Sequence, residues 1–221
     1  MNSRKWQAWV AVGILLWAWW LRVHSLNTPD YWSDEAYTLY SLRSGTLAGV
    51  VESLGRTEGT PPLFFWLMLG WTRLGSVELF GRTIPALLGV VAVAGAMRLG
   101  REAGGHEVGW LAGAWLAVSY LMVQLSRQIR GYPLALVWVE AILWLTLWLI
   151  RRGRWRDVAL WVAASAAGLY TSYFIVWVIA VSGLAVLAGG RERRGWQARL
   201  AVTGAGVLIA LISLRPLLRM Q

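Results

Sequence analysis

The sequence contains no cysteine and only two histidines, His24 and His106, in 221 residues. The absence of cysteine excludes disulfides, a thiolate nucleophile and zinc-thiolate sites, and two histidines are too few for a histidine-rich metal cage. Acidic residues are also scarce, because 11 Asp and Glu stand against 21 Lys and Arg and give a formal charge of +10. Few residues can therefore supply a catalytic or metal-binding carboxylate.

Hydrophobic residues, by contrast, make up 57% of the chain, 17 residues are tryptophan, and only 14% are charged. This composition is incompatible with an ordinary soluble domain and predicts an all-α integral membrane protein. The arginines occur in short clusters between apolar runs, where membrane topology and anionic headgroups explain them. We therefore expect membrane lipids as partners, and no nucleic acid.

Seven apolar runs have near-spanning length, and they predict about seven transmembrane helices. The first run follows Arg4 and Lys5 and lacks a small-x-small cleavage site, so we expect an uncleaved span in the cell membrane, with the N-terminus in the cytoplasm. Residues 158–188 are too long for one span and are expected to form two, with a turn at 170–173. The runs are Trp6 to Leu21, Thr83 to Leu99, Val108 to Leu125, Pro133 to Ile150, Val158 to Tyr170, Tyr173 to Ala188 and Leu200 to Leu214.

The segment from Pro61 to Leu74 is apolar but short, and the side on which every later loop lies depends on whether it crosses the membrane. If it does not cross, twelve of the 21 basic residues lie in short cytoplasmic loops. If it does cross, the clusters at 151–156 and 191–194 move outside, which the positive-inside rule disfavours. We therefore expect an interfacial or re-entrant helix here, and an extracytoplasmic loop over residues 24–82 within a single membrane module of residues 1–221.

The unusual polar residues gather on this outer face. Residues 34–54 have the apolar spacing of an amphipathic surface helix, interrupted near 44–46. Asp34 and Glu35 at its start are adjacent carboxylates near lipid, where one can hold its proton while the other acts as a base. The alternative is an ordinary helix cap formed by Ser33 or Asp34. Other polar residues expected on this face are Asp30, Glu52, Glu58, Glu78, Arg82, Arg127, Gln128, Arg130 and Tyr132.

Four motifs, taken in order, resemble those of the GT-C membrane glycosyltransferases that use polyprenyl-phosphate sugars, among them the protein O-mannosyltransferases and the aminoarabinose lipid A transferases. No single motif is specific, but their order and spacing suit the family across about residues 5–190, which corresponds to its N-terminal seven-span module. The motifs are the pair Asp34-Glu35, the helix start Pro61-Pro62-Leu63-Phe64-Phe65, the element Arg82-x-x-Pro85-Ala86, and the stretch Ser126-Arg127-Gln128-Ile129-Arg130-Gly131-Tyr132.

The resemblance implies seven core spans, two surface helices in the first external loop, and inverting transfer of a sugar from polyprenyl phosphate to an acceptor. Asp34 would then be the catalytic base, and Arg82 and Arg130 would bind the leaving phosphate. Glu35 would either bind a divalent cation with Asp34, the one cofactor that the sequence leaves open, or lie in solvent. The substrate site would also include Arg127, Tyr132 and Trp32, the last stacked on a sugar ring. The alternative for the three arginines is anchoring at the membrane interface.

The chain also departs from the family pattern. Thr60 stands where many members have His or Lys, and Ile129 stands where Glu is usual. Members generally continue beyond seven spans, so we expect a minimal member, half of a split enzyme that needs a second membrane subunit, or a truncated reading frame.

Two other functions remain open: a noncatalytic subunit that binds lipid-linked sugars, and a transporter or flippase of such lipids. Glu140 bears on the second, because it falls in the middle of the span from Pro133 to Ile150. A carboxylate at this depth suits either a proton relay or an interhelical hydrogen bond.

Overall fold

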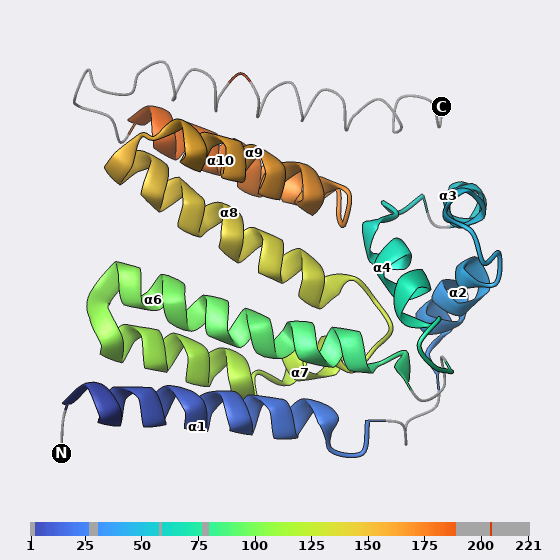
Figure 1. Cartoon of the computed structure of the whole chain (residues 1–221), viewed down its shortest axis with the longest axis horizontal. Helices are drawn as coiled ribbons and strands as arrows, with labels where there is room; N and C mark the ends of the chain where they lie inside the picture. The colour runs from blue at the N-terminus through green and yellow to red at the C-terminus, as the bar shows by residue number, and fades with distance from the viewer. Residues whose placement is uncertain (1–2, 27–30, 58, 77–79, 189–203, 205–221) are drawn as a thin grey trace. The chain divides into compact units, whose positions relative to one another are not determined.

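The structure is a computed structural model that describes residues 3–26, 31–57, 59–76, 80–188 and 204 (Figure 1). All regular secondary structure in these residues is helical, which confirms the predicted all-α class for the described part of the chain. The chain divides into two compact units, Met1–Val137 and Trp138–Gln221, and each is described by itself.

The first unit is built on α1 (Ser3–Val23), which packs along α6 (Thr83–Val118). α6 folds back on itself because Gly104 and Gly105 leave helical geometry, and Gly105 adopts a φ of 88° that favours glycine. Figure 1 shows the resulting hairpin in green. The first limb, 83–103, contains the run predicted from Thr83 to Leu99, and the second, 106–118, contains only the first part of the run predicted from Val108 to Leu125. The second limb breaks at Ser119 and continues as α7 (Tyr120–Ser126).

The two limbs of the hairpin approach closely at glycines. A Cβ on Gly109 would lie 2.6 Å from the carbonyl oxygen of Met97, and a Cβ on Gly100 would lie 2.8 Å from the carbonyl oxygen of Val108. Both clashes are with backbone atoms, so no side-chain rotation relieves them. Small residues therefore set the distance between the limbs, as they do at many helix pairs in membranes.

Gly109→Ala is accordingly expected to destabilise the protein by roughly 1–3 kcal/mol, because the limbs must move apart to admit the methyl group. Gly13→Ala in α1 is the matched control, since a Cβ there meets no atom within 4 Å and alanine favours helix. Thermal unfolding in detergent, followed by circular dichroism, should give a lower midpoint for Gly109→Ala only. Equal midpoints for the two variants would contradict the close packing.

Arg22, in the last turn of α1, is 1% exposed and reaches the end of the second hairpin limb. Its Nη1 donates to the carbonyl oxygens of Ala18 at 3.0 Å and Ala117 at 3.2 Å, and its Nη2 donates to that of Leu116 at 3.2 Å. The break at Ser119 leaves the last carbonyl groups of the limb without helical partners, and the guanidinium satisfies two of them. The end of α1 is thereby fixed to the hairpin.

Three short helices are described between α1 and α6, namely α2 (Ser33–Leu42), α3 (Leu47–Arg56) and α4 (Leu63–Trp71). The predicted amphipathic helix is confirmed with its interruption, because the chain turns at Gly45, with φ 67°, between α2 and α3. The resemblance implied two surface helices in this loop, and their position at the membrane surface stays a prediction. α4 covers about 14 Å, which is too short to cross a bilayer and agrees with the prediction for Pro61 to Leu74.

The second unit contains most of α8 (Tyr132–Arg152), followed by α9 (Trp155–Leu169) and α10 (Ile175–Ala188). The fully buried Trp161 of α9 donates from Nε1 to Oγ1 of Thr146 on α8 at 3.0 Å. α9 and α10 are joined by a turn at the predicted place, where the N–H of Thr171 donates to the carbonyl oxygen of Gly168 at 2.9 Å. Glu140 is 8% exposed, and its Oε2 has no hydrogen-bond partner among the described residues.

Two helices of the described part, α6 and α8, are long and apolar enough to cross a membrane. α1 has 21 residues, but five of them are tryptophan, which counts little in hydropathy although its ring favours the membrane interface. The seven-span topology, the outer position of loop 24–82 and the cytoplasmic N-terminus stay predictions. The run from Leu200 to Leu214 lies outside the described residues.

Candidate active site

Glu35 lies in the first turn of α2 and is fully buried. Its Oε2 accepts a hydrogen bond at 3.2 Å from the backbone N–H of Trp32, the extended residue that precedes the helix. This backward contact satisfies a donor that the helix itself leaves without a partner. The cap predicted on Ser33 or Asp34 is thus formed by Glu35, and the expectation that Glu35 lies in solvent was wrong.

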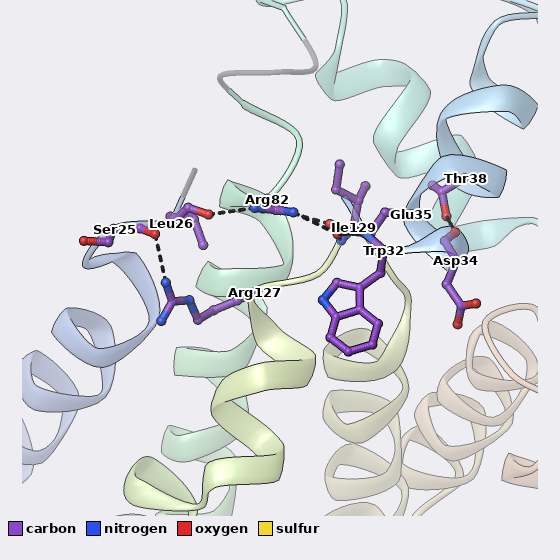
Figure 2. A network of polar contacts seen from close by, with 9 residues as sticks. All are labelled: Ser25, Leu26, Trp32, Asp34, Glu35, Thr38, Arg82, Arg127 and Ile129. Carbon is purple, nitrogen blue, oxygen red and sulfur yellow. Dashed lines mark hydrogen bonds and ion pairs between the residues drawn. The ribbon is translucent and has the colours of Figure 1, made fainter. Parts of the chain in front are cut away.

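Arg82, which immediately precedes α6, holds the Glu35 carboxylate with two parallel hydrogen bonds (Figure 2). Its Nε donates to Oε1 at 2.9 Å and its Nη2 to Oε2 at 2.8 Å, while its Nη1 donates to the carbonyl oxygen of Leu26 at 3.0 Å. The backbone N–H of Ile129 also donates to Oε1, at 2.9 Å. The two parallel hydrogen bonds and the additional backbone donor offset the desolvation cost of burying the two charges.

The burial of this pair changes the roles expected from sequence. Arg82 is 4% exposed and lies over the ring of Tyr31 at 4.9 Å, so the structure places its guanidinium inside the protein rather than at a surface where a phosphate would bind. The four hydrogen bonds to Glu35 join α2, the start of α6 and the stretch that contains Ile129. Glu35 and Arg82 therefore hold together the segments that carry the exposed site residues.

The side chain of Asp34 points away from the buried pair and toward solvent (Figure 2). Its side chain is 53% exposed, and Figure 2 shows its carboxylate directed away from the Glu35–Arg82 pair, as expected for consecutive helical residues about 100° apart. The two carboxylates therefore do not form the joint cation site considered from sequence. Among the residues that the structure describes, no cluster of three or more His, Cys, Asp or Glu is placed to hold a metal ion.

The close partner of Asp34 is Arg130. Its Nη2 lies 3.8 Å from Oδ2 of Asp34, and its Nη1 donates to the carbonyl oxygen of Asp34 at 3.3 Å and to Oγ1 of Thr38 at 3.5 Å. The guanidinium also lies 5.9 Å from the ring centroid of Tyr132, which is 43% exposed. Arg130 is thus held between α2 and the start of α8, with its charge beside an exposed carboxylate.

The stretch between α7 and α8 is fixed at several points. Nη2 of Arg127 donates to the carbonyl oxygens of His24 at 3.0 Å and Ser25 at 2.9 Å, just after α1. The side chain of Ile129 is fully buried, so this residue contributes through its backbone where the family usually has Glu. A Cβ on Gly131 would lie 3.2 Å from Phe64, so glycine lets the stretch pack against α4. Arg127 ties the stretch to the end of α1.

An open cavity of about 630 Å³ is lined by Asp34 and Arg130. Thr60, at the position that departs from the family pattern, lines it as well, together with Tyr37, Arg56 and Thr57. Sequence reasoning missed Tyr37, Arg56 and Thr57, because Arg56 has the ordinary spacing of a helical ion pair with Glu52, at 2.6 Å, and only the turn at Gly45 brings α3 to the site. Trp32, at 65% exposure, and Tyr132 lie outside this lining. Asp30, Glu58 and Glu78 lie outside the described residues.

One family model, described as dolichyl-phosphate-mannose-protein mannosyltransferase, matches residues 59–218, which is more than half of the chain. The chain belongs to this mannosyltransferase family. The family is of the GT-C kind and implies a membrane glycosyltransferase, which confirms the resemblance found in the motifs. Among curated proteins and among solved structures, no chain matched this one.

The family match covers one part of the site and not the other. In this mannosyltransferase-family chain, residues 59–218 include Thr60, Arg82, Ile129 and Arg130, whereas α2 with Asp34 and Glu35 precedes the matched region. Contacts in the structure connect the two parts: Arg82 and Ile129 donate to Glu35, and Arg130 donates to the carbonyl oxygen of Asp34. The segment outside the match is therefore packed onto residues inside it.

Proposed function

We propose that this protein is an inverting glycosyltransferase that moves a sugar from a polyprenyl-phosphate lipid to an acceptor at the outer face of the cell membrane. One observation carries the proposal: the Asp34 carboxylate and the Arg130 guanidinium lie 3.8 Å apart and line an open cavity of about 630 Å³. The reaction needs a base for the acceptor proton and a cation for the leaving phosphate. Membership of the family supports the reaction class.

In the proposed reaction, Asp34 takes the proton of the acceptor hydroxyl as its oxygen attacks the anomeric carbon of the sugar. The bond from that carbon to the phosphate oxygen breaks, and the polyprenyl phosphate leaves with the electron pair. Arg130 stabilises this negative charge, because its planar fork can hold two phosphate oxygens. Arg56 supplies a second cation to the same cavity. Attack from the face opposite the leaving group inverts the anomeric configuration.

The remaining predicted residues take supporting roles in this proposal. Glu35 and Arg82 are positioning residues, since their buried pair fixes the first turn of α2 against residue 129 and so sets the separation of Asp34 and Arg130. Tyr132 supports the Arg130 guanidinium with its ring, and Trp32 offers an exposed face to a sugar. Arg127 maintains the course of the chain next to Arg130.

The proposal is tested on purified protein in lipid nanodiscs with a panel of radiolabelled polyprenyl-phosphate sugars. Sugar transfer or hydrolysis, lipid binding and lipid movement between leaflets are measured on the same preparation. We expect sugar to be released or transferred with an inverted anomeric configuration. Lipid binding without turnover would overturn the proposal in favour of a noncatalytic subunit. Lipid movement without transfer would identify a transporter, for which the buried Glu140 would be the residue to substitute.

Arg130 has a prediction of its own. Arg130→Lys keeps the positive charge but loses the fork, so we expect kcat/KM for the donor to fall about tenfold, and Arg130→Gln to lower it about 100-fold. Arg43→Gln removes an equal charge from the end of α2, outside the cavity lining, and should leave kcat/KM unchanged. Equal losses for Arg43→Gln and Arg130→Gln would show that only the overall charge of the loop matters.

A further inference from the structure

A second large cavity, of about 710 Å³, lies between the start of α1 and the α6 hairpin. α1 contributes Gln7 and Ala8 to its lining, and Arg98, Arg101, His106 and Trp110 come from the two limbs on either side of the hairpin turn. Gln7 lies fifteen positions before Arg22, or roughly 22 Å along α1. The cavity is therefore at the opposite end of the α1–α6 pair from the loop that carries Asp34.

The polar side chains of this cavity are basic or neutral. Two guanidinium groups, an imidazole and an amide line it, and no carboxylate does among the residues that the structure describes. Glu102, one turn along the helix, pairs with Arg98 at 2.9 Å and restrains that side chain, but it is not part of the lining. Arginine forks of this kind match the geometry of phosphate oxygens. The volume falls within the range of ordinary ligand sites.

The aromatic residues around the cavity indicate its depth in the membrane. Trp6 and Trp110 meet edge to face with ring centroids 5.0 Å apart, and His106 lies 6.0 Å from Trp110. Trp6 and Trp9, near the start of α1, are 47% and 72% exposed. Tryptophan near the end of an apolar helix occupies the headgroup level of a bilayer. The tryptophans beside the cavity are therefore of the kind found at the level where lipid phosphates are concentrated.

We propose that this cavity binds the phosphate of an anionic lipid headgroup, with Arg98 and Arg101 as its ligands and Trp110 against the glycerol. Basic pockets between membrane helices are suited to such headgroups. The occupant is a lipid because exposed apolar side chains, among them Trp9, Val108 and Leu111, flank the cavity on α1 and the hairpin, so that acyl chains have a surface to follow. This site is separate from the Asp34 cavity and does not depend on the proposed transferase activity.

Native mass spectrometry of the detergent-purified protein tests the site directly. The protein is titrated with phosphatidylglycerol, with phosphatidylcholine and with inorganic phosphate. We expect phosphatidylglycerol to bind preferentially, and Arg98→Gln/Arg101→Gln to weaken its binding about tenfold or more. Arg154→Gln/Arg156→Gln is the matched control, because it removes the same charge from exposed arginines outside the lining and should leave the affinity unchanged.

A second variant keeps the test decisive if the double substitution fails to fold. Ala8→Phe fills the cavity without altering charge, and it is expected to weaken phosphatidylglycerol binding while circular dichroism and gel filtration stay unchanged. Equal weakening by the two double variants would overturn the proposal in favour of general surface charge, as would equal affinity for phosphatidylcholine. Tight binding of inorganic phosphate that competes with the lipid would support the phosphate ligands and overturn the lipid as their occupant.

Discussion

Asp34→Asn is expected to lower sugar transfer at saturating donor by at least about 100-fold while donor-lipid affinity changes little. Asparagine has nearly the same shape and still accepts hydrogen bonds, but its amide cannot take the acceptor proton, and a general base contributes roughly 10²- to 10⁴-fold. The side chain is 53% exposed and its neighbour Arg130 is also held by the Asp34 carbonyl and Thr38, so the fold should persist. Turnover and donor affinity are measured separately in nanodiscs.

The control for this substitution is Glu107→Gln, which makes the same chemical change on an exposed carboxylate next to the hairpin turn. It should retain full activity. If Asp34→Asn also retained full activity, Asp34 would have no part in proton transfer. A loss of donor binding with an unchanged rate at saturation would instead make Asp34 a substrate-binding residue.

The second large effect is on stability. Arg82→Leu is expected to lower the free energy of unfolding by about 3–5 kcal/mol, because it leaves the fully buried Glu35 carboxylate without its ionic partner. Adding Glu35→Gln to this variant should restore part of the loss. Glutamine keeps an oxygen that can accept from the N–H of Ile129 and removes the uncompensated charge. The order of stability expected is wild type, then the double variant, then Arg82→Leu.

Denaturant or thermal unfolding in detergent measures these differences. The reference pair is Arg56 and Glu52, which are 2.6 Å apart but 77% and 65% exposed, so Arg56→Gln should cost less than about 1 kcal/mol. A loss for Arg82→Leu no larger than that for Arg56→Gln would mean that the buried pair adds nothing to stability. A double variant less stable than Arg82→Leu would show that the backbone hydrogen bonds to the Glu35 carboxylate outweigh the cost of its unpaired charge.

Local features of this fold were predictable from the sequence because they depend on neighbouring residues. The break between α2 and α3 follows from Gly45, and the turn between α9 and α10 follows from the length of the apolar run. The hairpin within α6 separates two runs that were recognised as distinct. In each case, a glycine or an excess of length marks the position where the helix must end.

The candidate site was only partly predictable, because its contacts join residues far apart in the chain. Asp34 and Glu35 look like a pair in the sequence, yet helical geometry points them in different directions, and Glu35 meets Arg82, 47 residues later. The motif that contains Arg130 was located correctly, but the part played by the backbone of Ile129 has no signature in residue type. Arg22 attracted no prediction, since arginine at the end of an apolar run ordinarily lies at the interface.

The contacts of Arg22 also have a consequence for how the protein is made. Its guanidinium binds the carbonyl oxygens of Leu116 and Ala117, which follow it by 94 and 95 positions. The ribosome therefore completes α1 long before these partners exist, and until then the N–H groups that later meet them are left to water or lipid phosphates. The last turn of α1 can make its final contacts only after the α6 hairpin has been synthesised and has folded. Although α1 is synthesised first, its C-terminal end thus acquires its tertiary contacts late.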